Sequence, residues 1–267
     1  NQLTGTIPST IGQLNSLQQL ALDVNQLTGT IPSTIGHLTS LEHLDLAVNQ
    51  LSGTFPSSIS QLSILQILWL SYNHLTGTIP SIIGQLFNLS QLMLQGNQFI
   101  GAIPETIGQL SSLQFLWLSN NQLTGTIPSI IGQLASLEWL NISYNHLTGT
   151  IPSTIVQLSS LQDLDLQRNK LSGTIPSTID QIFLLRSLVL SYNQFNGTIP
   201  TTIGQLVSLQ VLLLDNNQLT GTITPSTIGQ LTSLQFLYLF SNRLTGSIPS
   251  AIGQLSSLVD LRLYDNE

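Results

Sequence analysis

The sequence predicts a solenoid of about eleven stacked coils, each built from two short strands and one turn. An asparagine recurs every 24 residues from Asn1 to Asn217, and Asn242 and Asn266 continue the series after one inserted residue. Apolar residues occupy the same positions in nearly every repeat, and a proline stands at the same place in each. A fixed period of this size is the signature of a repeat architecture.

Residues 25–48, NQLTGTIPSTIGHLTSLEHLDLAV, show the elements of one coil. The segment 44–46 alternates apolar and polar residues, as does the segment 28–31, and this period of two predicts strands. Pro32 ends the second strand because proline has no amide donor. From residue 33 to residue 41 the apolar residues are spaced by three around Gly36, which predicts a 3₁₀ or helical turn rather than a stable helix.

The same position in two other coils holds Val156 and Asp180 in place of Gly36, so ordinary backbone angles are expected there. One coil cannot bury its own leucines, but stacking places Leu44 above Leu68 and Leu92 in a continuous core. The recurring asparagine lies between buried positions, so its amide must find hydrogen-bond partners. We expect a ladder of asparagines that bond the backbone of adjacent coils. The extra residue within 223–225 predicts a local bulge.

The repeat follows the pattern L-x-x-L-x-L-x-x-N-x-L-x-G-x-I-P along the whole chain. It resembles the plant-type, extracellular leucine-rich repeats of receptor-kinase ectodomains, polygalacturonase-inhibiting proteins and a plant antifreeze protein. The resemblance implies a right-handed superhelix with a parallel concave sheet, a second short flank sheet and turns on the convex side. It also implies an extracellular or cell-surface location. It does not select one function among those proteins.

The terminal caps of that family usually carry cysteine pairs, whereas this chain contains no cysteine. Residues 1–267 are therefore expected to form one solenoid domain that is uncapped at both ends and is a segment of a longer protein. Uncapped solenoid ends also favour association. End-to-end self-association into an extracellular filament or a cell-surface stalk is therefore an alternative function.

Composition excludes several classes of function. Charged residues make up 6% of the chain and its net charge is −7, whereas a nucleic-acid-binding protein needs clustered basic residues. No apolar stretch is long enough for membrane insertion. The histidines are His37, His43, His74 and His146, and none of them form the paired spacing of a metal site. No cofactor is expected.

Catalytic residues are not expected either. Asp163 and Asp165 share one face of a predicted strand, a spacing that resembles the paired carboxylates of glycosidases. An open sheet provides no deep pocket, and Arg168 and Arg186 are expected to lie close enough to neutralise the pair. No serine has a fixed histidine and acid partner. We therefore predict a non-catalytic protein.

The predicted concave face carries the unusual side chains. The equivalent positions of successive coils form columns of outward-pointing side chains, and these columns hold all three tryptophans. Nine of the twelve acidic residues lie in strand segments. Large exposed apolar patches with polar rims mark interaction sites, although strands favour aromatic residues in any case. The predicted ligand is a peptide, a protein or a glycan. The predicted binding residues are Ile67, Trp69, Tyr72, Met93, Phe115, Trp117, Trp139 and Tyr144.

The flank strands carry a second array, in which threonines form two columns. Stacked strands repeat at about 4.7–4.9 Å and alternate residues at roughly 6.6 Å, so such a grid is a candidate for ice binding. Ile100, Ala102 and Asn196 interrupt it, sheet twist limits its flatness, and threonine is also an ordinary choice for exposed strands. The alternative ice-binding residues are Thr28, Thr30, Thr54, Thr76, Thr78, Thr124, Thr126, Thr148, Thr150, Thr174 and Thr198.

Three sequences match the acceptor pattern for N-glycosylation, at Asn88, Asn141 and Asn196. A glycan on Asn141 would stand within the predicted concave patch, and one on Asn196 would stand within the threonine grid. Chance matches are equally expected in a chain so rich in serine and threonine.

Overall fold

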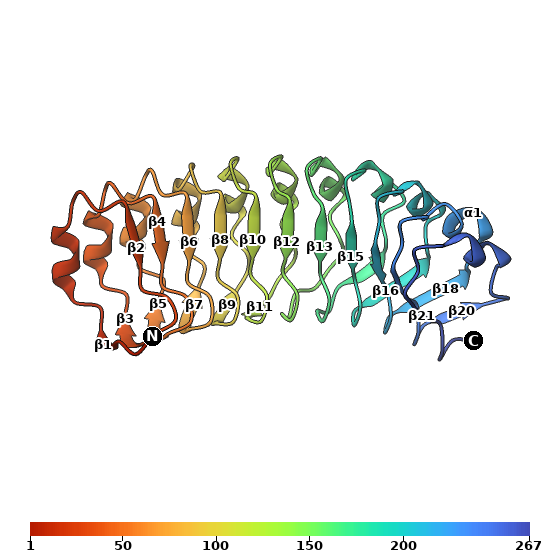
Figure 1. The fold of residues 1–267 in the computed structure, drawn as a ribbon, viewed down its shortest axis with the longest axis horizontal. Coiled ribbons are helices and arrows are strands. Elements are labelled where there is room, and N and C mark those ends of the chain that lie inside the picture. The colour runs from red at the N-terminus through yellow and green to blue at the C-terminus, as the bar shows by residue number, and fades with distance from the viewer.

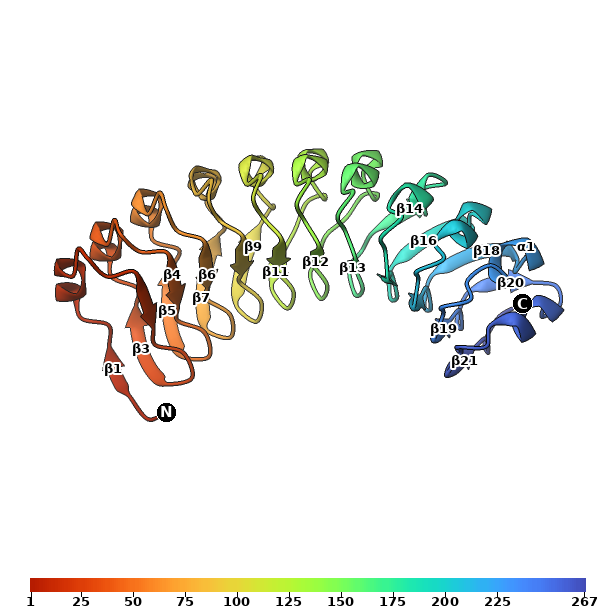
Figure 2. The ribbon, with the colours of Figure 1, turned by 45° about the horizontal axis from the view of Figure 1, so that its top comes forward.

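The computed structural model describes residues 1–267 and shows a solenoid bent into an arc (Figures 1 and 2). The turns follow the outer edge of the arc in Figure 2, and the long sheet lies toward its inner side. This sheet has eleven strands, all paired in parallel with the equivalent strand of the next coil. None of the helices is long and apolar enough to cross a bilayer. The predicted fold class is confirmed.

Each strand of the long sheet is three residues long and follows the turn of its coil. These strands are β2 (Gln19–Ala21), β4 (His43–Asp45), β6 (Ile67–Trp69), β8 (Gln91–Met93), β10 (Phe115–Trp117), β12 (Trp139–Asn141), β13 (Asp163–Asp165), β15 (Ser187–Val189), β17 (Val211–Leu213), β19 (Phe236–Tyr238) and β21 (Asp260–Arg262).

The flank strands form two sheets rather than the single sheet that the sequence led us to expect. One has six strands, β1 (Thr4–Thr6), β3 (Gln26–Thr30), β5 (Gln50–Thr54), β7 (His74–Thr78), β9 (Gln98–Gly101) and β11 (Gln122–Leu123). The other has four, β14 (Ser172–Thr174), β16 (Gln194–Thr198), β18 (Gln218–Thr222) and β20 (Arg243–Thr245). Between them only an isolated bridge joins Thr126 to Thr148.

The outer edge of the arc is made of short 3₁₀ turns, as expected from the spacing of three. They are η1 (Ser9–Gln13), η2 (Ser33–His37), η3 (Ser57–Gln61), η4 (Ser81–Gln85), η5 (Glu105–Gln109), η6 (Ser129–Gln133), η7 (Ser153–Gln157), η8 (Ile179–Gln181), η9 (Thr201–Gln205) and η10 (Ser250–Gln254).

In most coils the glycine within these turns is favoured by space and not by backbone angle, although Val156 and Asp180 replace it elsewhere. Gly36 and Gly84 have no positive φ, which confirms the expectation of ordinary angles. A Cβ atom at Gly36 would clash with the carbonyl oxygen of Ser58 in the next coil. Adjacent coils therefore approach each other closely at Gly36.

A single apolar core runs through all the coils. Leu44 pairs in register with Leu68, and Leu68 with Leu92, and all three are fully buried. Each such leucine contributes about 1.5–3 kcal/mol relative to an exposed one. The core therefore confirms the predicted stacking of equivalent leucines.

The asparagine ladder is present as predicted. The side-chain oxygen of Asn73 accepts a hydrogen bond from the amide of Leu51 in the preceding coil at 2.9 Å. Its side-chain nitrogen donates to the carbonyl oxygen of Leu46 in the preceding coil at 2.9 Å, and to that of Leu70 in its own coil at 3.2 Å. Each ladder asparagine thus joins two coils through backbone groups that would otherwise be buried without partners.

The local irregularity expected at residues 223–225 lies in the turn and not in the strand. β18 pairs with β20 in unbroken register through Thr222 and Thr245. The extra residue instead precedes α1 (Pro225–Ile228), which replaces the 3₁₀ turn of the other coils. Proline at the first helical position needs no amide partner there, so the helical turn accommodates the insertion.

The residue before each ladder asparagine has a left-handed conformation, which the sequence analysis did not identify. Val48 has a φ of 54°, and Asn120 and Asn216 have the same value at the equivalent place. This conformation is costly for a β-branched residue and is tolerated by asparagine.

We therefore expect Val48→Asn to raise the free energy of unfolding by about 1 kcal/mol, because it removes strain without removing buried contacts. Urea unfolding measures this change. Val207→Asn is the matched control, since Val207 is exposed and has no positive φ. An equal gain in both variants would contradict the assignment of strain to Val48.

Candidate functional site

A cluster of three aromatic side chains lies at the middle of the long sheet. Phe115 and Trp117 point outward from β10, and Trp139 points outward from β12, the adjacent strand. The ring centroids of Trp117 and Trp139 are 6.0 Å apart, and the two ring planes are inclined by 24°. The ring centroids of Phe115 and Trp139 are 5.7 Å apart. We call these three residues the tryptophan cluster. Pairs with this geometry are favourable beyond the area that they bury.

A diagonal hydrogen bond recurs on this face, from a ring in one strand to the residue 22 positions later. The indole Nε1 of Trp69 donates to Oε1 of Gln91 at 3.2 Å. The hydroxyl of Tyr238 likewise donates to Oδ2 of Asp260 at 2.7 Å.

At Trp117 this diagonal partner is missing, because the residue 22 positions later is Trp139, which offers no acceptor. The indole Nε1 of Trp117 is buried without a hydrogen-bond partner. Oε1 of Gln95, whose side chain is only 6% exposed, also has none. A buried donor or acceptor without a partner is costly, and such groups deserve a functional explanation.

The other predicted binding residues surround the cluster in different ways. Met93 pairs with both Trp69 and Trp117 and thus links the tryptophans across β8. Ile67 lies beside Gln91 at the same level. Tyr72 and Tyr144 are exposed three residues beyond the ends of β6 and β12, and Trp139 is exposed within β12. The remaining predicted residues are half-buried. The face is thus less exposed than expected.

Two carboxylates stand directly beside the cluster. Asp163 in β13 pairs with Trp139, and Asp165 pairs with Asn141. Burial raises the pKa of both carboxyl groups above the ordinary value, although hydrogen bonds from Ser187 and Gln167 respectively act in the opposite direction.

The expectation that arginines neutralise this pair was wrong. The chain's one ion pair joins Arg262 to Asp260 at 2.8 Å. Arg168 instead lies between two tyrosines, with its guanidinium carbon 4.0 Å from the ring centre of Tyr192 and 5.3 Å from that of Tyr144. The sequence did contain a signal for this stack, because these three residues are spaced by 24 and therefore occupy neighbouring coils.

The expected gathering of acids in strands is also only partly correct. Four acidic residues lie within the strands of the long sheet, namely Asp45, Asp163, Asp165 and Asp260. Glu42 and Glu138 precede strands, and the carboxylate of Glu138 accepts a hydrogen bond from Gln162 Nε2 at 3.2 Å. Three of these six acidic residues, Glu138, Asp163 and Asp165, lie at β12 and β13.

The raised pKa values have a consequence for stability. A group whose pKa is raised by folding stabilises the fold below its unfolded pKa, and this stabilisation is lost as the pH rises through the folded pKa. We expect Asp163→Asn/Asp165→Asn to gain stability relative to the native chain as the pH rises from 4 to 7. Urea midpoints at both pH values measure this difference. A difference that does not change with pH would contradict the burial of these charges.

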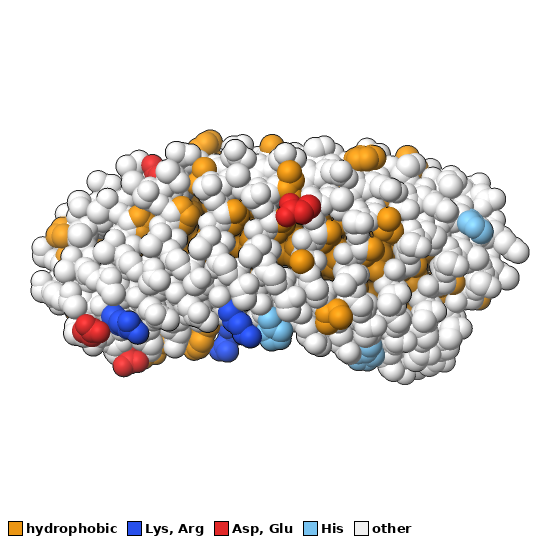
Figure 3. All heavy atoms as spheres, turned by 180° about the vertical axis from the view of Figure 1, so that it is seen from behind, with side chains coloured by type: hydrophobic (Ala, Val, Ile, Leu, Met, Phe, Trp, Pro, Cys, Tyr) orange, Lys and Arg blue, Asp and Glu red, His pale blue; other side chains and the backbone are white.

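The threonine array lies on the flank. The hydroxyl of Thr28 donates to the carbonyl oxygen of Gly5 at 3.3 Å, and that of Thr76 donates to Gly53 at 3.2 Å. These bonds orient the hydroxyls of Thr28 and Thr76 toward the preceding coil. Figure 3 shows the molecule from behind, where few charged side chains appear and a band of apolar groups follows its length. The break between β11 and β14 divides the array at Thr126, Thr148 and Thr150.

The acceptor asparagines occupy three different environments. Asn141 is half-buried in β12, and its side-chain oxygen accepts hydrogen bonds from the amide and hydroxyl of Ser143. Asn196 is exposed in β16, and Asn88 is exposed beyond η4, where it donates to the carbonyl oxygen of Ser63 at 2.8 Å. Asn141 is thus the least accessible of the three.

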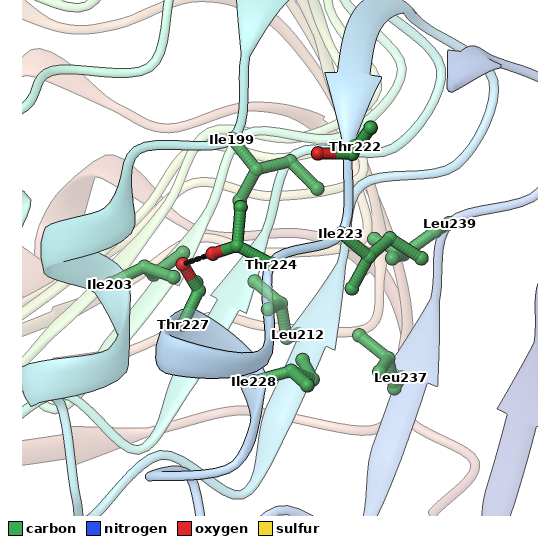
Figure 4. A pocket seen from close by; sticks show the side chains of 10 residues that line it. All are labelled: Ile199, Ile203, Leu212, Thr222, Ile223, Thr224, Thr227, Ile228, Leu237 and Leu239. Atoms are coloured by element: carbon green, nitrogen blue, oxygen red, sulfur yellow. Dashed lines mark hydrogen bonds between the residues drawn. The ribbon is translucent and has the colours of Figure 1, made fainter. Parts of the chain in front are cut away.

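An apolar cavity lies beneath the insertion, beside α1 (Figure 4). Its volume of about 10 Å³ is at the lower limit for a single water molecule. Ile199, Ile203 and Leu212 line it, and the hydroxyls of Thr224 and Thr227 bond to each other at 2.6 Å. The cavity is a packing defect left by the inserted residue and is too small for a ligand.

Comparison with known proteins gives two kinds of match. A model described as a leucine-rich repeat region matches residues 57–175, and a model described as a leucine rich repeat matches residues 15–75, 159–219 and 183–244. No curated protein sequence gives a significant match.

Three solved structures illustrate the similarity. The PEPR1–AtPEP1 crystal structure is 40% identical with a TM-score of 0.95, and the match covers 98% of this chain and 37% of that one. A second structure is the Arabidopsis receptor kinase HAESA in complex with the peptide hormone IDA and the co-receptor SERK1. It is 35% identical with a TM-score of 0.87, and the match covers 100% of this chain and 48% of that one. A plant ice-binding protein is 34% identical with a TM-score of 0.74, and the match covers 83% of this chain and 73% of that one. The chain spans less than half the length of the two former structures.

Proposed function

Since this chain belongs to the leucine-rich repeat family, we propose that it is a non-catalytic recognition module that binds a peptide on its concave face. The leucine-rich repeat is a non-catalytic fold. Two of the similar structures are complexes, one that includes AtPEP1 and one that includes the peptide hormone IDA. In keeping with the similar ectodomain structures, the proposed location is extracellular or at the cell surface.

The observation that carries this proposal is the tryptophan cluster with its missing hydrogen bond. An exposed Trp139 and an unpartnered Trp117 Nε1 stand together at the centre of an otherwise regular sheet. Tryptophan is the residue most enriched among binding hot spots. A peptide carbonyl that accepts from Trp117 would remove the cost of the unpaired indole.

A displayed library of random nonapeptides, sorted against the full chain, tests the proposal. We expect binders to be recovered and their binding to change the intrinsic tryptophan fluorescence, because all three tryptophans lie on the concave face. Binders that leave the fluorescence unchanged and bind equally to a chain with altered Trp117 and Trp139 would refute the concave site.

Ice binding by the flank is the second candidate, favoured by the similarity to the plant ice-binding protein and by the oriented hydroxyls of Thr28 and Thr76. The six-stranded flank sheet offers the longest regular surface. Rigid hydroxyls and methyls at strand spacing lose little entropy when they order water.

For this second function we expect measurable inhibition of ice recrystallisation, reduced at least about tenfold in Thr30→Tyr/Thr54→Tyr because bulky rings disrupt a flat contact. Ser111→Tyr is the control, since Ser111 is exposed outside the flank after η5. Absence of any inhibition in the native chain, or equal loss in the control, would reject ice binding.

A further inference from the structure

We infer that the peptide bound by the concave face carries a basic side chain, and that Asp163 and Asp165 hold this side chain beside the tryptophan cluster. This inference rests on the proposed peptide-binding function and specifies the class of ligand.

The two carboxylates share one face of β13 and lie next to an exposed aromatic ring. Strand pairing places Asp163 opposite Trp139, and burial disfavours the charge on both acids. No arginine or lysine forms an ion pair with them, since Arg262–Asp260 is the one ion pair of the chain. A bound guanidinium or ammonium group would neutralise the acids and contact the face of Trp139.

The opposite side of the cluster favours a peptide backbone over a free cation. Gln95 follows Met93 by two residues and therefore lies on the same side of its strand. Its Oε1 is an acceptor without a donor, and Trp117 Nε1 in the adjacent coil is a donor without an acceptor. An extended peptide supplies both an N–H and a C=O group. Both protein atoms are covered in the free chain, so side-chain rotation must accompany binding.

The spacing of these groups predicts a sequence pattern in the ligand. β10 and β13 are two strands apart in the sheet, which is roughly 10 Å at the usual strand separation. An extended chain advances roughly 3.3 Å per residue. Alternate residues of an extended chain face the same side. A basic residue two or four positions from an aromatic or aliphatic residue would therefore place one side chain over Asp163 and Asp165 and the other over Trp117.

The charge of the protein agrees with a basic partner. The chain has a net charge of −7 and five Lys and Arg residues. Of these cations, Arg168 is held between two tyrosines and Arg262 is held by Asp260. A basic peptide would thus meet carboxylates that have no competing cation bound to them.

The test sorts the displayed random nonapeptide library separately against the native chain and Asp163→Asn/Asp165→Asn. The native chain should enrich Lys or Arg two or four positions from an apolar residue. The variant should keep the apolar preference and lose the basic one, and its affinity for a selected basic peptide should fall at least about tenfold with a weaker dependence on salt.

The matched control is Glu105→Gln/Asp180→Asn, which removes the same number of charges from turns η5 and η8. Its affinity for the selected peptide should equal that of the native chain. Equal losses in the two double variants would overturn the inference, because the attraction would then be general. If the selected peptides are not enriched in Lys or Arg but still require Trp117 and Trp139 for binding, this inference is overturned while the proposed function stands. Peptides that bind independently of both tryptophans would overturn the proposed function as well.

Discussion

Replacing Asn121 with alanine is expected to lower the free energy of unfolding by about 3–5 kcal/mol, because several buried backbone groups lose their partners at once. Its side-chain oxygen accepts from the amide of Phe99 at 3.0 Å. Its side-chain nitrogen donates to the carbonyl oxygens of Leu94 and Leu118, each at 3.1 Å. Urea unfolding followed by circular dichroism measures the loss.

Asn88→Ala is the matched control for the ladder. Asn88 is exposed and makes one hydrogen bond, to the carbonyl oxygen of Ser63. A solvent-exposed bond of this kind contributes about 0.5–1 kcal/mol. Comparable losses in Asn88→Ala and Asn121→Ala would show that the ladder does not carry the coil-to-coil stability assigned to it.

The second large effect concerns binding. Trp117→Ala/Trp139→Ala should weaken the affinity for a library-selected peptide by about 3–5 kcal/mol, or roughly 100–5,000-fold. Both rings belong to one stacked pair, so their removal deletes the apolar platform together with the unpaired indole donor. Isothermal titration calorimetry measures the affinity. An affinity within about threefold of the native value would contradict the assignment of the site.

A subtler variant separates binding from folding. Gln91 accepts a hydrogen bond from the indole of Trp69. Trp139→Gln places the same side chain at the equivalent position beside Trp117, so the Trp117 indole gains a partner within the protein. We expect the free energy of unfolding to stay within about 1 kcal/mol of the native value while peptide affinity falls at least about tenfold. Phe183→Ala is the control, because Phe183 is exposed outside the long sheet and should leave the affinity unchanged.

The features that repeat in every coil could be predicted from sequence. Stacked leucines, the asparagine ladder and the proline-terminated flank strands all follow from rules that apply within one repeat. Leu44, Leu68 and Leu92 illustrate this, since the same position has the same burial in successive coils. The outward column that holds Trp69 and Trp117 follows from the alternation of strand residues.

The features that depend on which particular residues meet between neighbouring coils were not predicted, although the spacing of 24 did carry a signal for the Arg168 stack. The motif LTGTIP occurs both in the intact strand β3 and in the interrupted segment 147–152, so the break in the flank depends on how the coils stack. The unpaired Trp117 Nε1 depends on the identity of Trp139 in the next coil. Arg168 likewise pairs with tyrosines of adjacent coils rather than with Asp163 or Asp165 of its own.

Fluorine NMR of the chain labelled with 5-fluorotryptophan tests the central claim most directly, because its three tryptophans give three signals and all lie on the concave face. Single Trp→Phe variants assign the signals. On addition of a library-selected peptide, the signals of Trp117 and Trp139 should shift strongly and that of Trp69 should shift less. If calorimetry shows that the peptide binds while all three signals keep their positions, the concave face is not the binding site.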